Sequence, residues 1–167
     1  MEKLAIAVIK RSHGVKGFLR IKSLSGETNH FVTLKKVFIK EEGRERSFLI
    51  ESIKVISKDN LLIKLEGIDS PEATRTILGK EILVERKYAS PLKKGEYYIK
   101  DLCQCNVYKK DELVGHVKAV LGAGYNDLLE VSGVNGEILM IPFINHFVSV
   151  IDIKEKKIML TCNYEKP

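Results

Sequence analysis

Apolar and polar residues alternate along most of this chain in short segments, with a new segment about every eight to twelve residues. A period of two sends successive side chains to opposite faces of a strand. The pattern is typical of an all-β sandwich or barrel rather than of βαβ units. In the first half it predicts six strands, which suit a small barrel: Leu4–Lys10, Gly17–Leu24, Lys36–Ile39, Phe48–Ile56, Leu61–Glu66 and Glu81–Glu85.

The fifth of these strands shows the alternation most clearly. Leu61, Ile63 and Leu65 share one face, which is predicted to be core. Lys64 and Glu66 fall on the opposite face, which is predicted to contact water.

A short helix is predicted between the fifth and sixth strands, over residues 71–78. Ser70 can cap the first amides, Pro71 suits the first helical position, and Gly79 suits a left-handed stop. We expect this helix to plug one mouth of the barrel with Ile77 and Leu78.

The alternation breaks at residues 88–95, where Pro91, Gly95 and two adjacent lysines interrupt it. We therefore predict a first domain over residues 1–88, a linker over 89–95 and a second domain over 96–167. Seven strands are predicted beyond the break: Tyr97–Lys100, Gln104–Lys109, Leu113–Leu121, Leu128–Ser132, Glu137–Ile141, Phe147–Asp152 and Lys157–Cys162.

Two of the connections in the second domain have turn signals. Asn135-Gly136 favours a type I′ hairpin, because both central residues of that turn need positive φ. The glycines at 122 and 124 predict a flexible hairpin loop over residues 122–126.

Positive charge is concentrated in the first half. The chain has 167 residues and a formal net charge of +6, and all six arginines precede residue 90. Residues 10–40 contain eight basic side chains and a single acid, Glu27. Guanidinium groups match phosphate geometry, so this asymmetry indicates a polyanionic partner. A solvated strand surface with incidental lysines is the alternative.

A cationic strip with one aromatic residue is predicted on the second strand. Alternation sends Leu19 and Ile21 to the core and the intervening residues to the opposite face. Basic side chains there can neutralise phosphates, and Phe18 can stack on an unpaired base, unless it packs beneath the adjoining loop. The candidate RNA-binding residues are Lys10, Arg11, Lys16, Phe18, Arg20 and Lys22.

The sequence has no recognisable catalytic or metal-binding motif. Its four histidines lack metal-ligand spacing, and no phosphate loop or nucleophile elbow occurs. Cys103, Cys105 and Cys162 make no disulfide framework, so we expect reduced and mostly buried thiols. We expect no enzyme activity, metal or cofactor. No apolar run could span a bilayer and no secretory signal is present, so a cytoplasmic protein without membrane contact is expected.

Short motifs follow one another in order along nearly the whole chain: AVIKRSHGVKGFLRI at 7–21, GKEILV at 79–84, EYY at 96–98, LVGHV at 113–117, YNDLLEV at 125–131, IPF at 141–143 and VIDI at 150–153. Together they resemble the family of the ribosome maturation factor RimM. Ala7, where the family usually has glycine, the Cys103–Cys105 segment and the ending at 163–167 depart from its pattern.

The resemblance implies a six-stranded barrel like those of translation factors, followed by a PRC-type β-barrel, and no catalytic activity. Members of the family bind the immature small (30S) ribosomal subunit and help the head of 16S rRNA fold and be processed. They contact the small-subunit protein numbered nineteen. The double tyrosine that matches Tyr97-Tyr98 is tied in the family to binding of the subunit.

These features lead to the hypothesis of an assembly chaperone with two binding surfaces. The basic barrel would engage precursor 16S rRNA while the near-neutral second barrel grips a ribosomal protein. Tyr97, Tyr98 and Asp101 are the candidate protein-binding residues, with Asp127 and Glu130 as further acids for a cationic partner. Alternatively, both tyrosines pack against the linker. Rival hypotheses are an rRNA-processing enzyme, a general RNA-binding β-barrel and a membrane-associated PRC scaffold. We expect a monomer.

Overall fold

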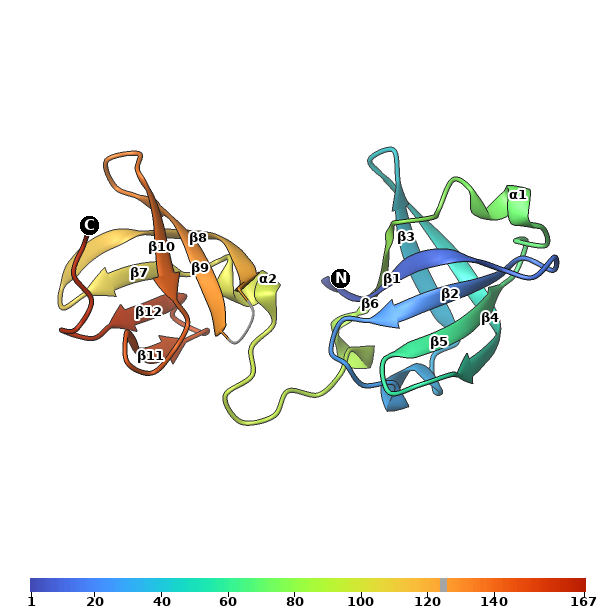
Figure 1. Cartoon of the computed structure of the whole chain (residues 1–167), viewed down its shortest axis with the longest axis horizontal. Helices are drawn as coiled ribbons and strands as arrows, with labels where there is room; N and C mark the ends of the chain where they lie inside the picture. The colour runs from blue at the N-terminus through green and yellow to red at the C-terminus, as the bar shows by residue number, and fades with distance from the viewer. Residues whose placement is uncertain (124–125) are drawn as a thin grey trace. The chain divides into compact units, whose positions relative to one another are not determined.

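The chain divides into two compact units, Met1–Pro91 and Leu92–Pro167, and each has its own hydrophobic core (Figure 1). The structure is a computed structural model, and it describes residues 1–123 and 126–167. Strands dominate both units, and the α-helices found in the described residues are two single turns, α1 (Pro71–Thr74) and α2 (Ile99–Leu102). The prediction of an all-β protein is confirmed.

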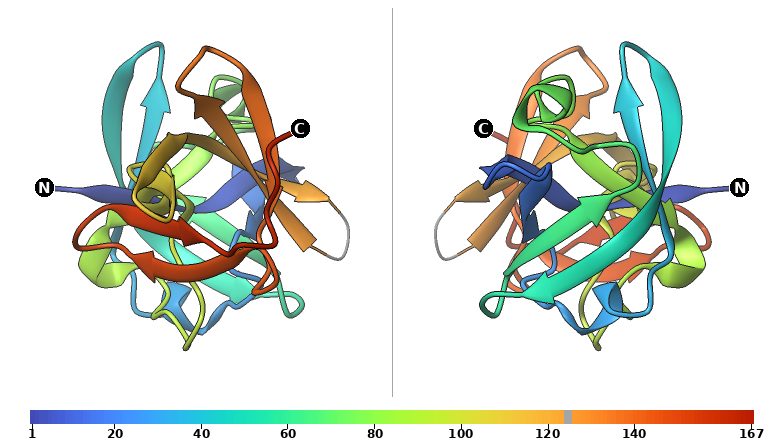
Figure 2. Two further views of the ribbon diagram at one scale, coloured as in Figure 1. Left: turned by 90° about the vertical axis from the view of Figure 1, so that its left-hand side faces the viewer. Right: turned by 90° about the vertical axis from the view of Figure 1, so that its right-hand side faces the viewer.

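Six antiparallel strands of the first unit close into a barrel in the order β1-β2-β5-β4-β3-β6 (Figure 2, right). They are β1 (Lys3–His13), β2 (Phe18–Ser23), β3 (Lys36–Glu41), β4 (Arg44–Val55), β5 (Asn60–Leu65) and β6 (Glu81–Glu85). Short 3-10 turns lie at Asn29–Phe31 and Arg86–Tyr88. Leu19 and Ile21 are fully buried, as the alternation of β2 predicts.

The helix before β6 forms where it is predicted but ends earlier. The Ser70 hydroxyl accepts a hydrogen bond from a first-turn amide at 3.2 Å, and Gly79 takes a φ of 77°. After Thr74 the chain continues as turns. Ile77 is fully buried in the barrel core, whereas Leu78 stays 36% exposed. The expectation that both side chains plug the barrel is therefore right for Ile77 and wrong for Leu78.

The second unit contains a six-stranded sheet in the order β10-β9-β8-β7-β12-β11. Its strands are β7 (Asn106–Lys109), β8 (Glu112–Ala123), β9 (Asn126–Gly133), β10 (Ile138–Pro142), β11 (Val148–Asp152) and β12 (Lys157–Leu160). β12 pairs in parallel with β7, and the other neighbours are antiparallel. The hairpin loop predicted at residues 122–126 includes residues 124 and 125, which lie outside the described part of the chain.

Two local predictions for this unit are wrong. Residues 97–100 do not form a strand: the amide of Leu102 donates to the Tyr98 carbonyl at 3.2 Å, which closes the turn of α2 and brings Leu102 into the core. At the β9–β10 hairpin only Gly136 has positive φ, 84°, and its amide donates to the Gly133 carbonyl. This hairpin has a three-residue loop ending in a left-handed glycine rather than a type I′ turn.

The three cysteines are free thiols in different surroundings. Cys105 is buried, Cys103 is half-buried and Cys162 is exposed, so the expectation of burial is wrong for Cys162. Desolvation raises the pKa of the Cys103 and Cys105 thiols, which favours their neutral form.

Among residues 1–123 and 126–167, no three His, Cys, Asp or Glu side chains are placed to hold a metal ion. Over the same ranges, no helix has the length and apolarity to cross a membrane.

Candidate functional site

The β1–β2 hairpin brings most of the candidate RNA-binding residues to one outer face of the barrel. Arg11 pairs with Arg20 and His13 pairs with Phe18, and directly paired residues of neighbouring strands share a face. Arg20 and Phe18 are half-buried, whereas Arg11 is exposed. Phe18 is therefore only partly buried and is not sealed beneath a loop.

The other three candidates lie around this pair. Lys10 is exposed at the bulge where the β1–β2 register shifts, and Lys16 is exposed in the turn before β2. Lys22 is exposed on β2, but its ammonium lies 3.6 Å from the carboxylate of Asp59. Lys22 is thus partly neutralised within the protein.

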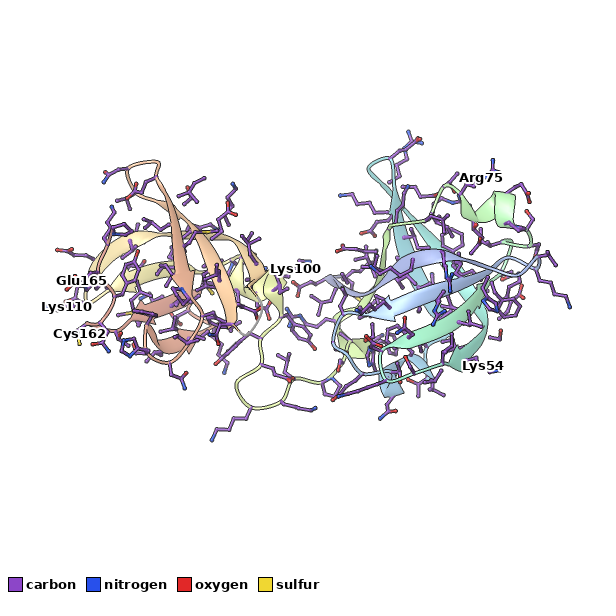
Figure 3. All side chains as sticks on the ribbon, in the orientation of Figure 1. Lys54, Arg75, Lys100, Lys110, Cys162 and Glu165 are labelled. Carbon is purple, nitrogen blue, oxygen red and sulfur yellow. The ribbon has the colours of Figure 1, made fainter. Side chains whose placement is uncertain are left out.

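Sequence reasoning missed two residues that extend this face across the barrel. Arg20 pairs with Leu62 of β5, and Leu62 pairs with Lys54 of β4. Lys54 is exposed and is labelled in Figure 3 beside β4. Only the strand order shows that Lys54 lies on the same face as Arg11. We call the row Arg11, Arg20, Leu62 and Lys54 the cationic row.

The turn that leads into β2 is held by a close backbone contact. Gly17 has a φ of 75°, and a Cβ on it would lie 2.0 Å from the Ile68 carbonyl oxygen. Only glycine fits there, because a larger residue would overlap backbone that cannot move aside cheaply. The turn carrying Lys16 therefore rests on the segment after β5.

That segment is in turn fixed by Lys64, which was predicted to contact water but is 7% exposed. Its ammonium donates to the Ile68 carbonyl at 2.8 Å, the Asp69 carboxylate at 2.7 Å and the Leu65 carbonyl at 3.3 Å. The alternation fails here because the chain after β5 folds back over the lysine, and the ammonium is buried only because oxygen acceptors surround it.

The paired tyrosines precede α2 in the second unit and take different positions. Tyr97 is half-buried, and its ring meets Phe143 edge-on with centroids 6.3 Å apart. Tyr98 is half-buried at the N-cap of α2, and Asp101 is half-buried within that helix. Neither tyrosine is sealed inside the unit.

Tyr97 also borders a pocket of about 180 Å³. The lining combines apolar side chains with two small polar ones: Gly95, Tyr97, Phe143, Ile144, Asn145, Val148, Ser149 and Ile151. The pocket could receive one side chain of a partner.

Of the further acids, Asp127 is exposed, but Glu130 is paired with Lys118 at 2.8 Å.

The two units define a protein built from a closed six-stranded β-barrel followed by a second, smaller β unit. The RimM N-terminal domain family matches residues 4–89, and the RimM PRC barrel domain family matches residues 99–164. The chain therefore belongs to the RimM family, which confirms the resemblance and both halves of the predicted fold class.

Two relatives from Treponema agree with this assignment. The ribosome maturation factor RimM of Treponema denticola is 36% identical over 173 aligned positions that cover 96% of each chain. That of Treponema pallidum is 37% identical over 92% of this chain and 95% of its own. The solution structure of the N-terminal domain of RimM from Thermus thermophilus covers 56% of this chain and 100% of that one, at 20% identity and a TM-score of 0.44.

Proposed function

We propose that this protein is a non-catalytic ribosome maturation factor that binds the immature 30S subunit and helps the head of 16S rRNA fold and be processed. The observation that supports the proposal most is the cationic face of the first unit, where Arg11, Arg20 and Lys54 gather from three strands. Such a face can neutralise rRNA phosphates. The protein would act in the cytoplasm as a monomer.

In this proposal the second unit binds the small-subunit protein numbered nineteen through Tyr97, Tyr98 and Asp101. A half-exposed tyrosine beside a pocket is a suitable anchor, since aromatic side chains give large contact area at low entropic cost. Holding rRNA and a ribosomal protein on one chain raises their effective concentration for each other.

Co-sedimentation with immature small subunits tests the proposal. The double variant Tyr97→Ala/Tyr98→Ala should lose association, and Tyr88→Ala, an exposed tyrosine of the first unit, is the matched control. Because Tyr97 packs against the core of its unit, circular dichroism must show that the variant is folded. Retained co-sedimentation of a folded double variant would contradict the assigned role of the tyrosines.

The rival hypothesis of an rRNA-processing enzyme needs its own measurement. Pure protein is incubated with precursor 16S rRNA and Mg²⁺, and the RNA is analysed on a denaturing gel. Intact RNA supports a chaperone. Specific cleavage would show that the proposed lack of catalysis is wrong.

A further inference from the structure

The cationic row crosses four neighbouring strands of the barrel instead of following one. Arg11 on β1 pairs with Arg20 on β2, Arg20 pairs with Leu62 on β5, and Leu62 pairs with Lys54 on β4. Neighbouring strands lie about 4.8 Å apart, so the row extends about 14 Å at right angles to the strands.

The two arginines of the row are an unfavourable pair for the isolated fold. Like charges that lie directly opposite across two strands destabilise a sheet. Within the part of the chain that the structure describes, no carboxylate forms an ion pair with Arg11, Arg20 or Lys54. An external anion would remove this repulsion, and guanidinium groups bind phosphate oxygens in a bidentate manner.

Apolar surface accompanies the charges. Leu62 lies within the row, and the His13–Phe18 pair lies next to it along the same two strands. Phe18 and Leu62 are each partly exposed. Bases of an unpaired strand can contact such side chains while the phosphates contact the cations, whereas the bases of a duplex are already stacked and paired.

We propose that a single-stranded phosphodiester chain crosses the barrel from β1 over β2 and β5 to β4, with Lys54 as its far contact. The strand would run across β2 rather than along it. The inference rests on the proposed rRNA binding and adds the direction of the bound strand and a residue outside the linear basic stretch.

The test compares two single-charge variants of the full chain. Lys54→Gln removes the charge at the far end of the row. Lys40→Gln removes the charge of an exposed lysine on β3, a strand that pairs with β4 and β6 but not with β1, β2 or β5. Both lose one positive charge from an outer strand position. Fluorescence anisotropy then measures binding of a labelled single-stranded fragment of precursor 16S rRNA over a range of salt concentrations.

Lys54→Gln should weaken binding roughly five- to tenfold near physiological salt. It should also make the negative slope of log K against log salt less steep by about 0.7, the effect of one lost phosphate contact on a single strand. Lys40→Gln should change both quantities far less. If the two variants behave alike while the parent binds RNA, the proposed path is wrong but rRNA binding stands.

Two other outcomes would contradict the inference. If the parent protein does not bind the fragment at all, the rRNA-binding role of the barrel fails as well. If a polyglutamate peptide binds with the same affinity and the same sensitivity to Lys54→Gln, the row recognises an acidic polypeptide, and the inference of a nucleic-acid strand is overturned.

Discussion

Replacing Lys64 by methionine should destabilise the first unit although the change makes a buried position more apolar. The ammonium makes two short hydrogen bonds, to the Ile68 carbonyl and to the Asp69 carboxylate. A hydrogen bond to a charged group contributes about 1.5–3 kcal/mol. The Asp69 side chain is 77% exposed, so solvent screening reduces its share to about 0–1 kcal/mol. Burial of a thioether in place of an ammonium offsets part of the loss, and we expect a net loss of about 2 kcal/mol.

Calorimetry of the full chain measures this effect. For a domain of roughly this size, about 2 kcal/mol corresponds to a decrease in Tm of about 8–16 °C. Lys54→Met is the matched control: it removes the same group from an exposed position on the adjacent strand β4 and should change stability by less than about 0.5 kcal/mol.

Hydrogen exchange locates the effect within the chain. Because the Ile68 carbonyl contacts both Lys64 and Gly17, amides of residues 14–17 and 66–69 should exchange faster in Lys64→Met than in Lys54→Met. A Lys64→Met protein as stable as Lys54→Met would refute the view that the buried ammonium holds this turn.

Three further predictions concern the first unit. Gly17→Ala should lower the free energy of unfolding by at least about 2 kcal/mol in a thermal melt, because the left-handed φ and overlap with the Ile68 carbonyl both oppose a Cβ. Gly14→Ala is the control: Gly14 also has positive φ but open space around it, so the loss should be about 1 kcal/mol. Ser70→Ala should lose about 1 kcal/mol in urea unfolding through the lost N-cap, and an unchanged midpoint would argue against that role. Burial lowers the pKa of His30 below its usual value of about 6.5. As the pH falls, the imidazole is therefore protonated in the unfolded chain before it is protonated in the folded one. The stability that neutral, buried His30 contributes should be full above about pH 6.5 and should decline below it. His30→Phe should lack this part of the decline between about pH 7 and about pH 5, and identical pH profiles would show the assignment to be wrong.

Local patterns in the sequence predict much of this fold, because they depend on neighbours in the chain. Leu19 and Ile21 face the core by simple alternation, and Ser70 caps its helix through an amide three residues away. The strand predicted over Tyr97–Lys100 does not form, because the chain makes the helical turn α2 there and buries Leu102.

The parts of the site that were not predicted depend on residues distant in sequence. Lys54 joins Arg11 and Arg20 only because β5 lies between β2 and β4, and an alternating pattern does not reveal strand order. Burial of Lys64 depends on how the following turn folds back over it. The predicted domain limits, the tyrosine site and the RNA-binding residues stay predictions, and the binding experiments above address the tyrosine site and RNA binding.

The parallel pairing of β12 with β7 has a consequence for how the chain folds as it is synthesised. The first barrel is complete once β6 has joined β1 and β3, before any strand of the second unit has emerged from the ribosome. In the second unit, β7 and β11 each pair with β12 along one edge, and β12 emerges from the ribosome after every other strand of that sheet. Until β12 emerges, the backbone N–H and C=O groups on those edges of β7 and β11 have no partner. Nascent chains stalled before Lys157 should therefore be more prone to proteolysis and aggregation in the second unit than in the first.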